Sequence, residues 1–452
     1  MLDVVNYILG LGAAIFLPLV MIILGLAMGM TLKKAISAGL TLGIAFTGMN
    51  VILGFMFDAI GPAATALVEH TGLQLTAIDV GWSPIAAIAW AWPYALILFP
   101  VQIGINILML ALKWTNCLNV DLWNVWGKIF VAAMVMGLTG SLVFGLIAAG
   151  IQIVFELING DLIQKQLYRI CKIPGVTCTH PMMLQAPLLS LINRGLDFIP
   201  GLNAVNMNAA DMRKKLGLFG ENSVMGFLIG ALIAVMGGYD VKGVLTTAIQ
   251  VATSLVLFPM VAKLFMQALA PIADAAGAFM KARFKGREFY VGLDWPFLAG
   301  SSELWVTAII LVPFELLWAV GLSYFDMNNV IPLASVINVV VAVPALIVTG
   351  GNLVRMIIIC IIATPTYLWV ATSFAGMLTD MAAQTGTLQV NAGQYITWIQ
   401  LEVPELRWAL AHAFNGEIAG IGLLIAFCAM FVWYFKRMKV RDAELEAADN
   451  KA

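Results

Sequence analysis

The feature that most constrains this chain is a series of long segments with almost no charged residues. A helix needs about 20 apolar residues to cross the hydrocarbon core of a bilayer, and runs of this kind recur from one end of the sequence to the other. Hydrophobic residues make up 62% of the chain and charged residues only 11%, whereas soluble domains carry about 25% charged residues. The sequence therefore predicts an all-α polytopic membrane protein.

Hydropathy predicts about eleven spans, the fifth of which is short and interrupted by prolines. They lie near Val4–Met28, Ala35–Phe57, Trp92–Leu112, Ile129–Phe155, Val176–Asn193, Asn222–Gly238, Val244–Ala262, Leu304–Tyr324, Asn328–Thr349, Met356–Leu378 and Ile418–Phe435. Basic residues gather on the cytoplasmic side of membrane proteins, so the tail Lys436–Arg441 places the C-terminus in the cytoplasm. An odd number of spans then places the N-terminus in the periplasm.

Several function classes are excluded by what the sequence lacks. A net charge of -1 leaves no basic face for nucleic acid. No phosphate-binding loop of the G-x-x-x-x-G-K-[ST] type occurs. The cysteines have no metal-ligand spacing, so neither a metal nor another cofactor is expected. Cys171 and Cys178 could form a disulfide if their loop faces an oxidising compartment; otherwise they are free thiols.

Four pairs of residues indicate an internal repeat. Two pairs are offset by 209 residues and two by 213: Lys33 with Lys242, Pro62 with Pro271, Trp82 with Trp295, and Pro100 with Pro313. The linker before Trp295 carries basic residues between Lys281 and Arg287, whereas the linker before Trp82 has none. The two linkers are therefore expected on opposite sides of the membrane, which makes the repeats inverted, as in many secondary transporters.

The repeat divides the chain into three parts. Residues 1–217 form the first repeat with spans 1–5, residues 218–380 form the second with spans 6–10, and residues 381–452 hold the last span and the basic tail. In each repeat a short segment rich in glycine and proline precedes a full span, near 79–91 and 292–303. Such segments suit re-entrant hairpins, because backbone groups that leave a helix must line a polar cavity rather than lipid.

The hairpin tips supply four candidate binding residues. Asp79 and Asp294 would place carboxylates near bilayer depth, where ionisable groups are costly and usually functional. Either aspartate could instead cap the short helix that follows it. Trp82 and Trp295 could stack on the C–H faces of a sugar or could anchor the chain at the membrane interface.

Three further candidates lie outside the two hairpins. His180 opens a short apolar run at a His–Pro step and could bind substrate or serve as a structural histidine. Asn124 lies in the amphipathic stretch "NVDLWNVWGK", which could contact substrate or anchor at the interface. Glu221 opens the sixth predicted span, and Glu315 lies deep in the eighth, where it could carry a proton or bond a neighbouring helix.

Four strings in the chain resemble a known family. "IDVGW" (78–82), "NVDLWNVW" (119–126), "GYDVKGVL" (238–245) and "EFYVGLD" (288–294) are similar to the galactitol-type IIC membrane component of the bacterial sugar phosphotransferase system, within the ascorbate–galactitol superfamily. The likeness runs from the first span to the last.

The resemblance implies an inner-membrane homodimer with a scaffold and a core that moves like an elevator. It implies that a separate IIB protein phosphorylates the sugar from its phosphocysteine and that a IIA protein recharges IIB. His180 lies where related chains have a conspicuous histidine at a similar turn, and Asp294 matches an aspartate that contacts substrate in the ascorbate branch. Two residues depart from the galactitol pattern, since Gly127 stands in place of a histidine and Pro181 in place of a glycine. Another polyol, such as arabitol, is therefore a possible substrate.

The expected function is a permease that carries a polyol, galactitol first, for phosphorylation by IIB, with no catalytic residue in this chain. A neutral polyol calls for hydrogen-bonding groups and aromatic faces, and a phosphorylated product would not fit a site built for a neutral solute. The main alternative is an ion-coupled secondary transporter that uses Glu315 or Asp294 as its proton carrier. Membrane lipid is the other expected contact.

Overall fold

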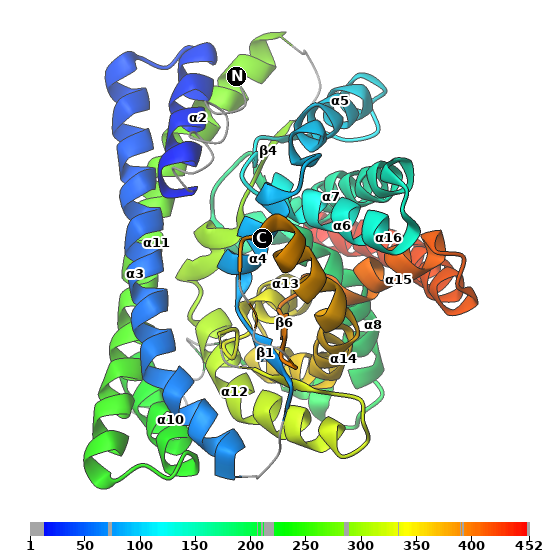
Figure 1. The fold of residues 1–452 in the computed structure, drawn as a ribbon. Coiled ribbons are helices and arrows are strands. Elements are labelled where there is room, and N and C mark those ends of the chain that lie inside the picture. Colours follow the sequence, from blue (N-terminus) through cyan, green and yellow to red (C-terminus); the bar gives the residue numbers. More distant parts are fainter. Residues whose placement is uncertain are drawn as a thin grey trace.

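The computed structural model of the chain is mostly helical and describes residues 13–70, 75–205, 207–208, 211, 221–283, 289–332, 334–388, 390 and 393–449. Four helices form a group of their own at the left of Figure 1. They are α2 (Ala13–Ala27), α3 (Leu32–His70), α10 (Asn222–Met236) and α11 (Val241–Arg283). In this bundle α3 packs against both α2 and α11, and α10 packs against α11.

The remaining helices form a second, larger group to the right of this bundle (Figure 1). The α-helices are α4 (Trp82–Ala91), α5 (Leu98–Ala111), α6 (Val125–Thr139), α7 (Leu142–Cys171), α8 (Ala186–Leu196), α12 (Ser302–Ser323), α13 (Val339–Thr349), α14 (Leu353–Thr385), α15 (Pro404–Phe414) and α16 (Ile418–Asp449). Four short 3-10 helices accompany them: η1 (Ala95–Ile97), η2 (Pro181–Gln185), η3 (Leu202–Ala204) and η5 (Trp295–Gly300).

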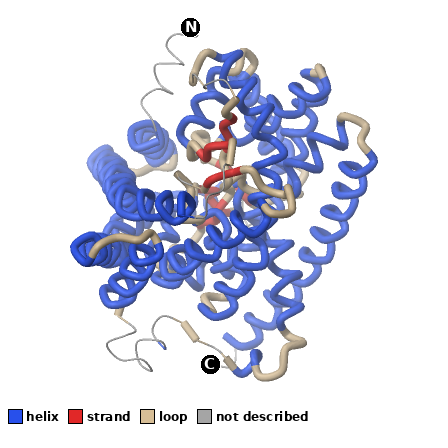
Figure 2. Tube along the Cα trace, turned by 60° about the horizontal axis from the view of Figure 1, so that its bottom comes forward, coloured by secondary structure: helices blue, strands red, loops and turns tan. Residues whose placement is uncertain are grey.

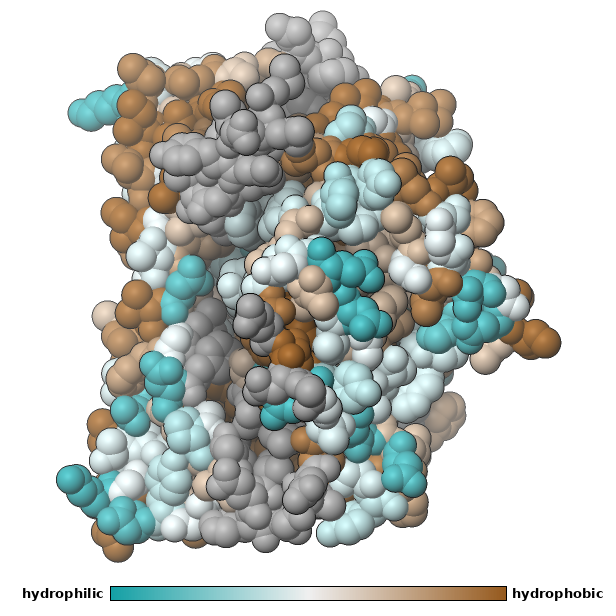
Figure 3. All heavy atoms as spheres, in the orientation of Figure 1, coloured by the Kyte–Doolittle hydropathy of each residue, from teal (hydrophilic) through white to brown (hydrophobic). Residues whose placement is uncertain are grey.

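Six helices in the described part of the chain are long and apolar enough to cross a membrane: α3, α7, α11, α12, α14 and α16. A seventh span is formed if α4 and the helical segment Ala95–Ala111 are counted together, although a bend of 91° separates them. The exposed side chains agree with a lipid-facing role, since hydrophobic residues gather at the upper left and upper right of Figure 3, where Figure 1 places α2, α3 and α5. The count of six or seven is lower than the eleven expected.

The difference arises mainly at the fifth, sixth and ninth expected spans, where the helices α8, α10 and α13 are only 11, 15 and 11 residues long, too short to cross the hydrocarbon core. The expected span Ile129–Phe155 is two helices, since Gly140 ends α6 in a left-handed conformation and Ser141 caps α7. Every residue from Val125 to Val135 of α6 is buried. The expected spans Val176–Asn193 and Asn328–Thr349 each contain a strand followed by a short helix. The first expected span begins in residues that lie outside the described part of the chain.

Two small parallel sheets lie at the centre of the molecule, enclosed by helices (Figure 2). The strands are β1 (Ala77–Asp79), β2 (Cys117–Asn119), β3 (Val176–Cys178), β4 (Tyr290–Leu293), β5 (Val330–Ile331) and β6 (Tyr395–Thr397). One sheet has the order β5-β1-β6 and the other β2-β4-β3. In each sheet the central strand therefore comes from one half of the chain, and both outer strands come from the other half.

The register of the two sheets follows one offset. Ala77 of β1 pairs with Val330 of β5, and Tyr290 of β4 pairs with Cys117 of β2. Tyr290 follows Ala77, and Val330 follows Cys117, by 213 residues, the same offset that relates Trp82 to Trp295. The order long helix, strand, short helix, helix and strand also occurs twice, from α3 to β2 and from α11 to β5.

The strands lie in segments in which the backbone is not helical. Because they are enclosed by helices, their N–H and C=O groups need partners within the protein, and strand pairing supplies them. The second sheet is packed very tightly at Gly292 in β4. A Cβ atom there would lie 2.5 Å from the Thr179 side chain and 2.8 Å from the Cys117 sulfur. Glycine is required at this point by lack of space. Nearby, Cys171 and Cys178 are both free thiols and do not form the disulfide considered from the sequence.

Candidate functional site

A cavity of about 130 Å³ lies between α3 and the segments that follow the two sheets. Residues from both halves of the chain line it: Phe46, Met49, Asn50, Trp82, Trp123, Asn124, Trp126, His180, Met182, Asp294, Trp295, Pro296, Val339, Val340, Trp398, Gln400 and Glu402. The cavity thus has one wall from the four-helix bundle and the others from the larger helix group. Polar groups and large aromatic faces share its lining.

His180 holds the most informative position in this cavity. Its Nδ1 atom accepts a hydrogen bond of 3.2 Å from the backbone N–H of Met182. Because Nδ1 accepts, the ring proton belongs to Nε2, and the imidazole is a neutral donor. Nε2 lies 3.4 Å from a carboxylate oxygen of Glu402 and 3.7 Å from one of Asp294. Both distances exceed those of a well-formed hydrogen bond, so the Nε2 proton is available to donate to a hydroxyl group of a bound solute.

Glu402 forms a buried ion pair with an arginine that does not line the cavity. The Arg407 guanidinium donates to the Glu402 carboxylate, and both side chains are almost completely buried. The backbone is unusual here, since Glu402 and Val403 both have positive φ angles, 46° and 34°. Such conformations cost roughly 1–3 kcal/mol each and persist where the surroundings fix them, often at functional sites. The strained turn fixes the Glu402 carboxylate in the cavity.

Asn124 joins two carboxylates on the other side of the cavity. Its amide nitrogen donates to Asp121 at 2.7 Å, and the side chain also bonds Asp294. Asp294 in turn accepts the backbone N–H of Trp295 at 2.7 Å, so it caps η5 while lining the cavity. Asp294 therefore acts as the helix cap, one of the two alternatives considered, and substrate binding stays a prediction.

A buried ion pair supports the Asn124 segment. The Lys128 ammonium lies 2.7 Å from Glu156 of α7 and donates to the backbone carbonyl of Asn124. Lys128 and Glu156 are 1% and 0% exposed at their side chains. Gln152 donates a further hydrogen bond of 2.7 Å to Glu156. This network fixes the first turn of α6 without entering the cavity.

Tryptophans form much of the apolar wall. Five of the chain's 13 tryptophans line the cavity: Trp82, Trp123, Trp126, Trp295 and Trp398. The rings of Trp126 and Trp398 lie 5.6 Å apart and come from different halves of the chain. The indole nitrogen of Trp398 is buried and has no hydrogen-bond partner among the described residues. Flat apolar faces beside carboxylates and a neutral imidazole form a site suited to a neutral molecule rich in hydroxyl groups.

Comparison with known proteins identifies the family. The family described as "PTS system sugar-specific permease component" matches residues 7–393. The galactitol-specific EIIC component of the PTS system of Escherichia coli K12 is 35% identical over 411 residues, which cover 89% of this chain and 90% of that protein. A putative permease IIC component of the same organism is 30% identical over 440 residues, covering 97% of this chain and all of that protein. The chain belongs to this permease family.

As a PTS permease with several apolar helices, the chain is a multi-pass protein of the bacterial inner membrane and works on a sugar or polyol together with the soluble components of that system. The resemblance seen in the sequence motifs is thereby confirmed.

Five of the seven predicted binding residues of the permease lie together in the cavity: Trp82, Asn124, His180, Asp294 and Trp295. Asp79 does not line it. Its carboxylate accepts hydrogen bonds from the backbone of Gly81, Ser335 and Ile399 and from the Ser335 hydroxyl. Asp79 thus ties β1 to loops from the second half of the chain. Glu221 also lies away from the cavity, exposed at the start of α10.

The sequence analysis missed the contribution of the segment after β6. Trp398, Gln400 and Glu402 all line the cavity, yet this stretch lies between two predicted spans and reads as a charged loop. One signal was available: Glu402 and Arg407 stand close together among apolar residues, and paired charges in such a context are typical of a buried ion pair. Glu315 is completely buried and bonds Asn338, so it acts between helices rather than in the cavity.

The two departures from the galactitol pattern, Gly127 and Pro181, are neighbours in the structure. A Cβ atom on Gly127 would lie 3.3 Å from the Pro181 ring, 3.3 Å from Arg407 and 3.4 Å from Glu402. A large side chain at position 127 would therefore need a small residue at 181. Position 127 thus adjoins both Pro181 and the Glu402 carboxylate. Among the described residues, no group of three or more histidines, cysteines or carboxylates could hold a metal ion.

Proposed function

We propose that this permease carries a polyol, galactitol in the first place, across the inner membrane so that a partner IIB protein can phosphorylate it. The observation that supports the proposal most directly is the arrangement around His180. A neutral donor faces two acceptors, Glu402 and Asp294, across gaps of 3.4 and 3.7 Å. Hydroxyl groups both donate and accept, so a polyol chain could join all three groups.

Charge balance in the cavity favours a neutral solute over its phosphate ester. Glu402 is already paired with Arg407, and no lysine or arginine is among the described residues that line the cavity to compensate a dianion. A phosphate ester formed on the cytoplasmic side would therefore leave the site. Phosphorylation by IIB would then drive uptake without an ion gradient.

The proposed movement uses the two helix groups. The bundle of α2, α3, α10 and α11 would serve as a scaffold, and the larger group would carry the cavity past it as an elevator. In support, α3 contributes three cavity residues, Phe46, Met49 and Asn50, while the polar lining comes from the larger group. We further propose that the halves are inverted repeats divided at residue 217, that the N-terminus is periplasmic and the C-terminus cytoplasmic, and that the permease is a homodimer.

Galactitol is placed first because the relative at 35% identity is named as galactitol-specific. Arabitol or another polyol is the alternative, because Gly127 and Pro181 lie beside Glu402 and alter the space behind it. The basic linker from Lys281 to Arg287 is a proposed contact for IIB, although residues 284–288 of it lie outside the described part of the chain.

Uptake of radiolabelled galactitol tests the proposal. Cells that express the permease with and without its IIA and IIB partners would be compared, and the label inside would be separated into free and phosphorylated sugar. We expect galactitol phosphate only when the partners are present. Free galactitol that accumulates without them, and is lost when an uncoupler is added, would instead make the chain an ion-coupled transporter. Labelled arabitol in the same assay tests the alternative substrate.

A further inference from the structure

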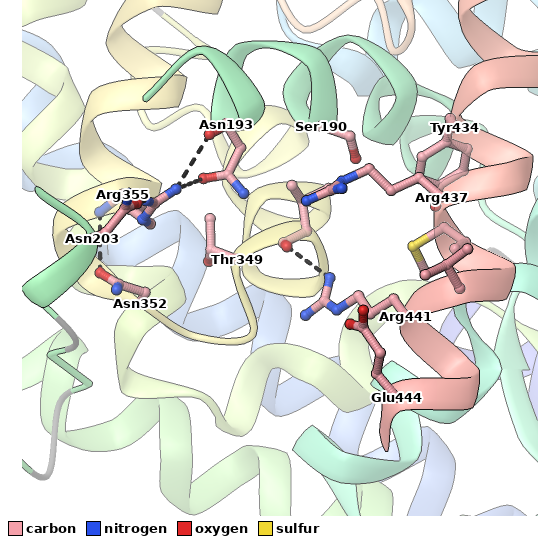
Figure 4. Close-up of a pocket in the computed structure, with 13 residues that line it drawn as sticks. Ser190, Asn193, Asn203, Thr349, Asn352, Arg355, Tyr434, Arg437, Arg441 and Glu444 are labelled. Atoms are coloured by element: carbon pink, nitrogen blue, oxygen red, sulfur yellow. Dashed lines mark hydrogen bonds between the residues drawn. The ribbon is translucent and has the colours of Figure 1, made fainter. Parts of the chain in front are cut away.

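A second cavity, of about 420 Å³, is lined mainly by polar and basic residues. Figure 4 shows it between α8, the turn that joins α13 to α14, and the C-terminal half of α16. The lining residues are Ser190, Asn193, Asn203, Val348, Thr349, Asn352, Arg355, Tyr434, Arg437, Met438, Val440, Arg441 and Glu444. It shares no residue with the cavity around His180.

The lining carries an excess of positive charge, with three arginines and one glutamate. Arg355 is compensated, because it pairs with Asp197 at 3.0 Å and bonds the side chain of Asn193. Arg441 donates to the backbone carbonyls of Ile347 and Val348, which are neutral. The neighbouring Asp442 offsets part of the charge of Arg441, whereas Arg437 and Arg169 are like charges that oppose it.

Arg437 has no ion pair or hydrogen bond among the described residues, although its side chain reaches from α16 toward α8 (Figure 4). It lies one helical turn before Arg441, and the two like charges repel one another. A bound anion would relieve this repulsion. The N-terminus of α14, at Asn352, also borders the cavity and adds the partial positive charge of a helix end.

Tyr434 provides an independent sign of a missing ligand. Its side chain lines the cavity and is only 1% exposed, yet its hydroxyl has no hydrogen-bond partner in the described part of the chain. Buried polar groups without a partner are rare in folded proteins. A hydroxyl donor beside two arginines is a set that fits the oxygens of a phosphate group.

The surroundings of the cavity indicate where such a phosphate comes from. Helix α16 is mostly exposed, since only 22% of the residues in its apolar, membrane-spanning segment are buried. Phe435 and Val440, which flank Arg437, are 39% and 58% exposed. The cavity therefore opens at the border between a lipid-facing helix and a basic segment. Basic pockets between membrane helices are typical binding sites for anionic lipid head groups.

We propose that this cavity binds the phosphate of an anionic phospholipid, with Arg437 and Tyr434 as the ligand-binding residues and Arg441 as the neighbouring positive charge. The lipid tails would lie along the exposed apolar face of α16. Arg355 and the amides around it would shape the far wall.

Native mass spectrometry of the purified full-length permease in detergent tests this, with phosphatidylglycerol and phosphatidylcholine added in separate titrations. The wild type is expected to bind phosphatidylglycerol more tightly. Arg437→Gln should weaken that binding by about fivefold, which corresponds to roughly 1 kcal/mol. Tyr434→Phe should weaken it as well, because only the hydroxyl is lost. Lys436→Gln, which removes an exposed positive charge one residue away, is the matched control and should change little.

Equal binding by the wild type and Arg437→Gln would overturn the proposal, and so would an equal loss in Lys436→Gln, since that would reflect general surface charge. A third arm adds inorganic phosphate or galactitol phosphate and follows thermal unfolding. Either soluble phosphate could raise the melting temperature of the wild type but not that of Arg437→Gln. If phosphatidylglycerol does not raise the melting temperature of the wild type in the same assay, the lipid assignment is overturned in favour of a soluble phosphate. Thermal unfolding without added ligand verifies that Arg437→Gln is folded.

Discussion

The Nε2 nitrogen of His180 lies 3.4 Å from a carboxylate oxygen of Glu402, although the two residues follow strands from opposite halves of the chain. His180 comes directly after β3, and Glu402 comes after β6. The permease thus brings a donor and an acceptor to one cavity by joining its two halves. A binding site built in this way depends on both halves at once.

Replacing Glu402 with glutamine should reduce sugar affinity strongly. A hydrogen bond to a charged group is worth about 1.5–3 kcal/mol, so the apparent Kd for galactitol should rise about tenfold to hundredfold. Binding of labelled sugar to purified protein measures this. The control is Glu405→Gln, three residues away, since Glu405 is partly buried, bonds Gln185 and does not line the cavity. Equal losses in both variants would contradict a direct role for Glu402.

Replacing Asp79 with alanine should lower stability and leave sugar affinity nearly unchanged. The change removes the acceptor for donors from Gly81, Ser335 and Ile399. Each buried donor left unsatisfied costs about 1–3 kcal/mol. Thermal unfolding and sugar binding should be measured on the same preparation. Asp294→Ala, in contrast, should weaken sugar binding. An Asp79 variant with normal stability but weak sugar binding would contradict the prediction and indicate that Asp79 contacts the sugar.

The Lys128–Glu156 ion pair should show strong coupling between its members. Lys128→Met leaves a buried carboxylate without its partner, which typically costs 3–5 kcal/mol. Lys128→Met combined with Glu156→Gln removes both charges and should recover much of that loss. The free energies of unfolding of the two single variants and the double variant form the test. Additive losses would show that the two charges act independently.

Gly292→Ala should destabilise the sheet that holds His180 in place. The new methyl group would meet the Thr179 side chain at 2.5 Å and the Cys117 sulfur at 2.8 Å. Overpacking of this kind costs typically 1–3 kcal/mol. Gly321→Ala in α12 is the control, because a Cβ atom there meets nothing within 4 Å. A melting temperature for Gly292→Ala equal to that of the control would show that β4 can shift away from Thr179.

Expression of the two halves as separate chains tests the exchange of strands. Residues 1–217 contain β1, β2 and β3, and residues 218–452 contain β4, β5 and β6, so neither sheet has all its strands in one fragment. Neither fragment should accumulate alone, while both together should give a stable complex. Protease resistance and co-purification measure the outcome. A fragment that is stable by itself would show that the sheets are dispensable for folding.

The sequence predicted five of the residues that line the cavity, and each of the six long apolar helices overlaps an expected span, but the expected number of spans was too high. Trp82, Trp295 and Asp294 were found because the repeated phrase placed tryptophan and charge at the head of an apolar run, and the hairpin geometry brings these groups together. The expected count exceeds six or seven partly because hydropathy does not distinguish a short buried helix such as α13 from a segment that faces lipid. Glu402 was not predicted as a cavity residue, because its position depends on contacts with Arg407 and His180 that a local sequence pattern does not reveal.

The strand exchange also bears on how the cavity can open. The segments that carry Trp82 and Trp295 follow the central strands β1 and β4, and each central strand is hydrogen-bonded on both sides to strands of the other half. A hinge that opened one segment while the other stayed closed would have to break backbone hydrogen bonds in a sheet enclosed by helices. Independent gates at the two ends of the cavity are thus disfavoured. Both walls are expected to shift together as one rigid unit against α3.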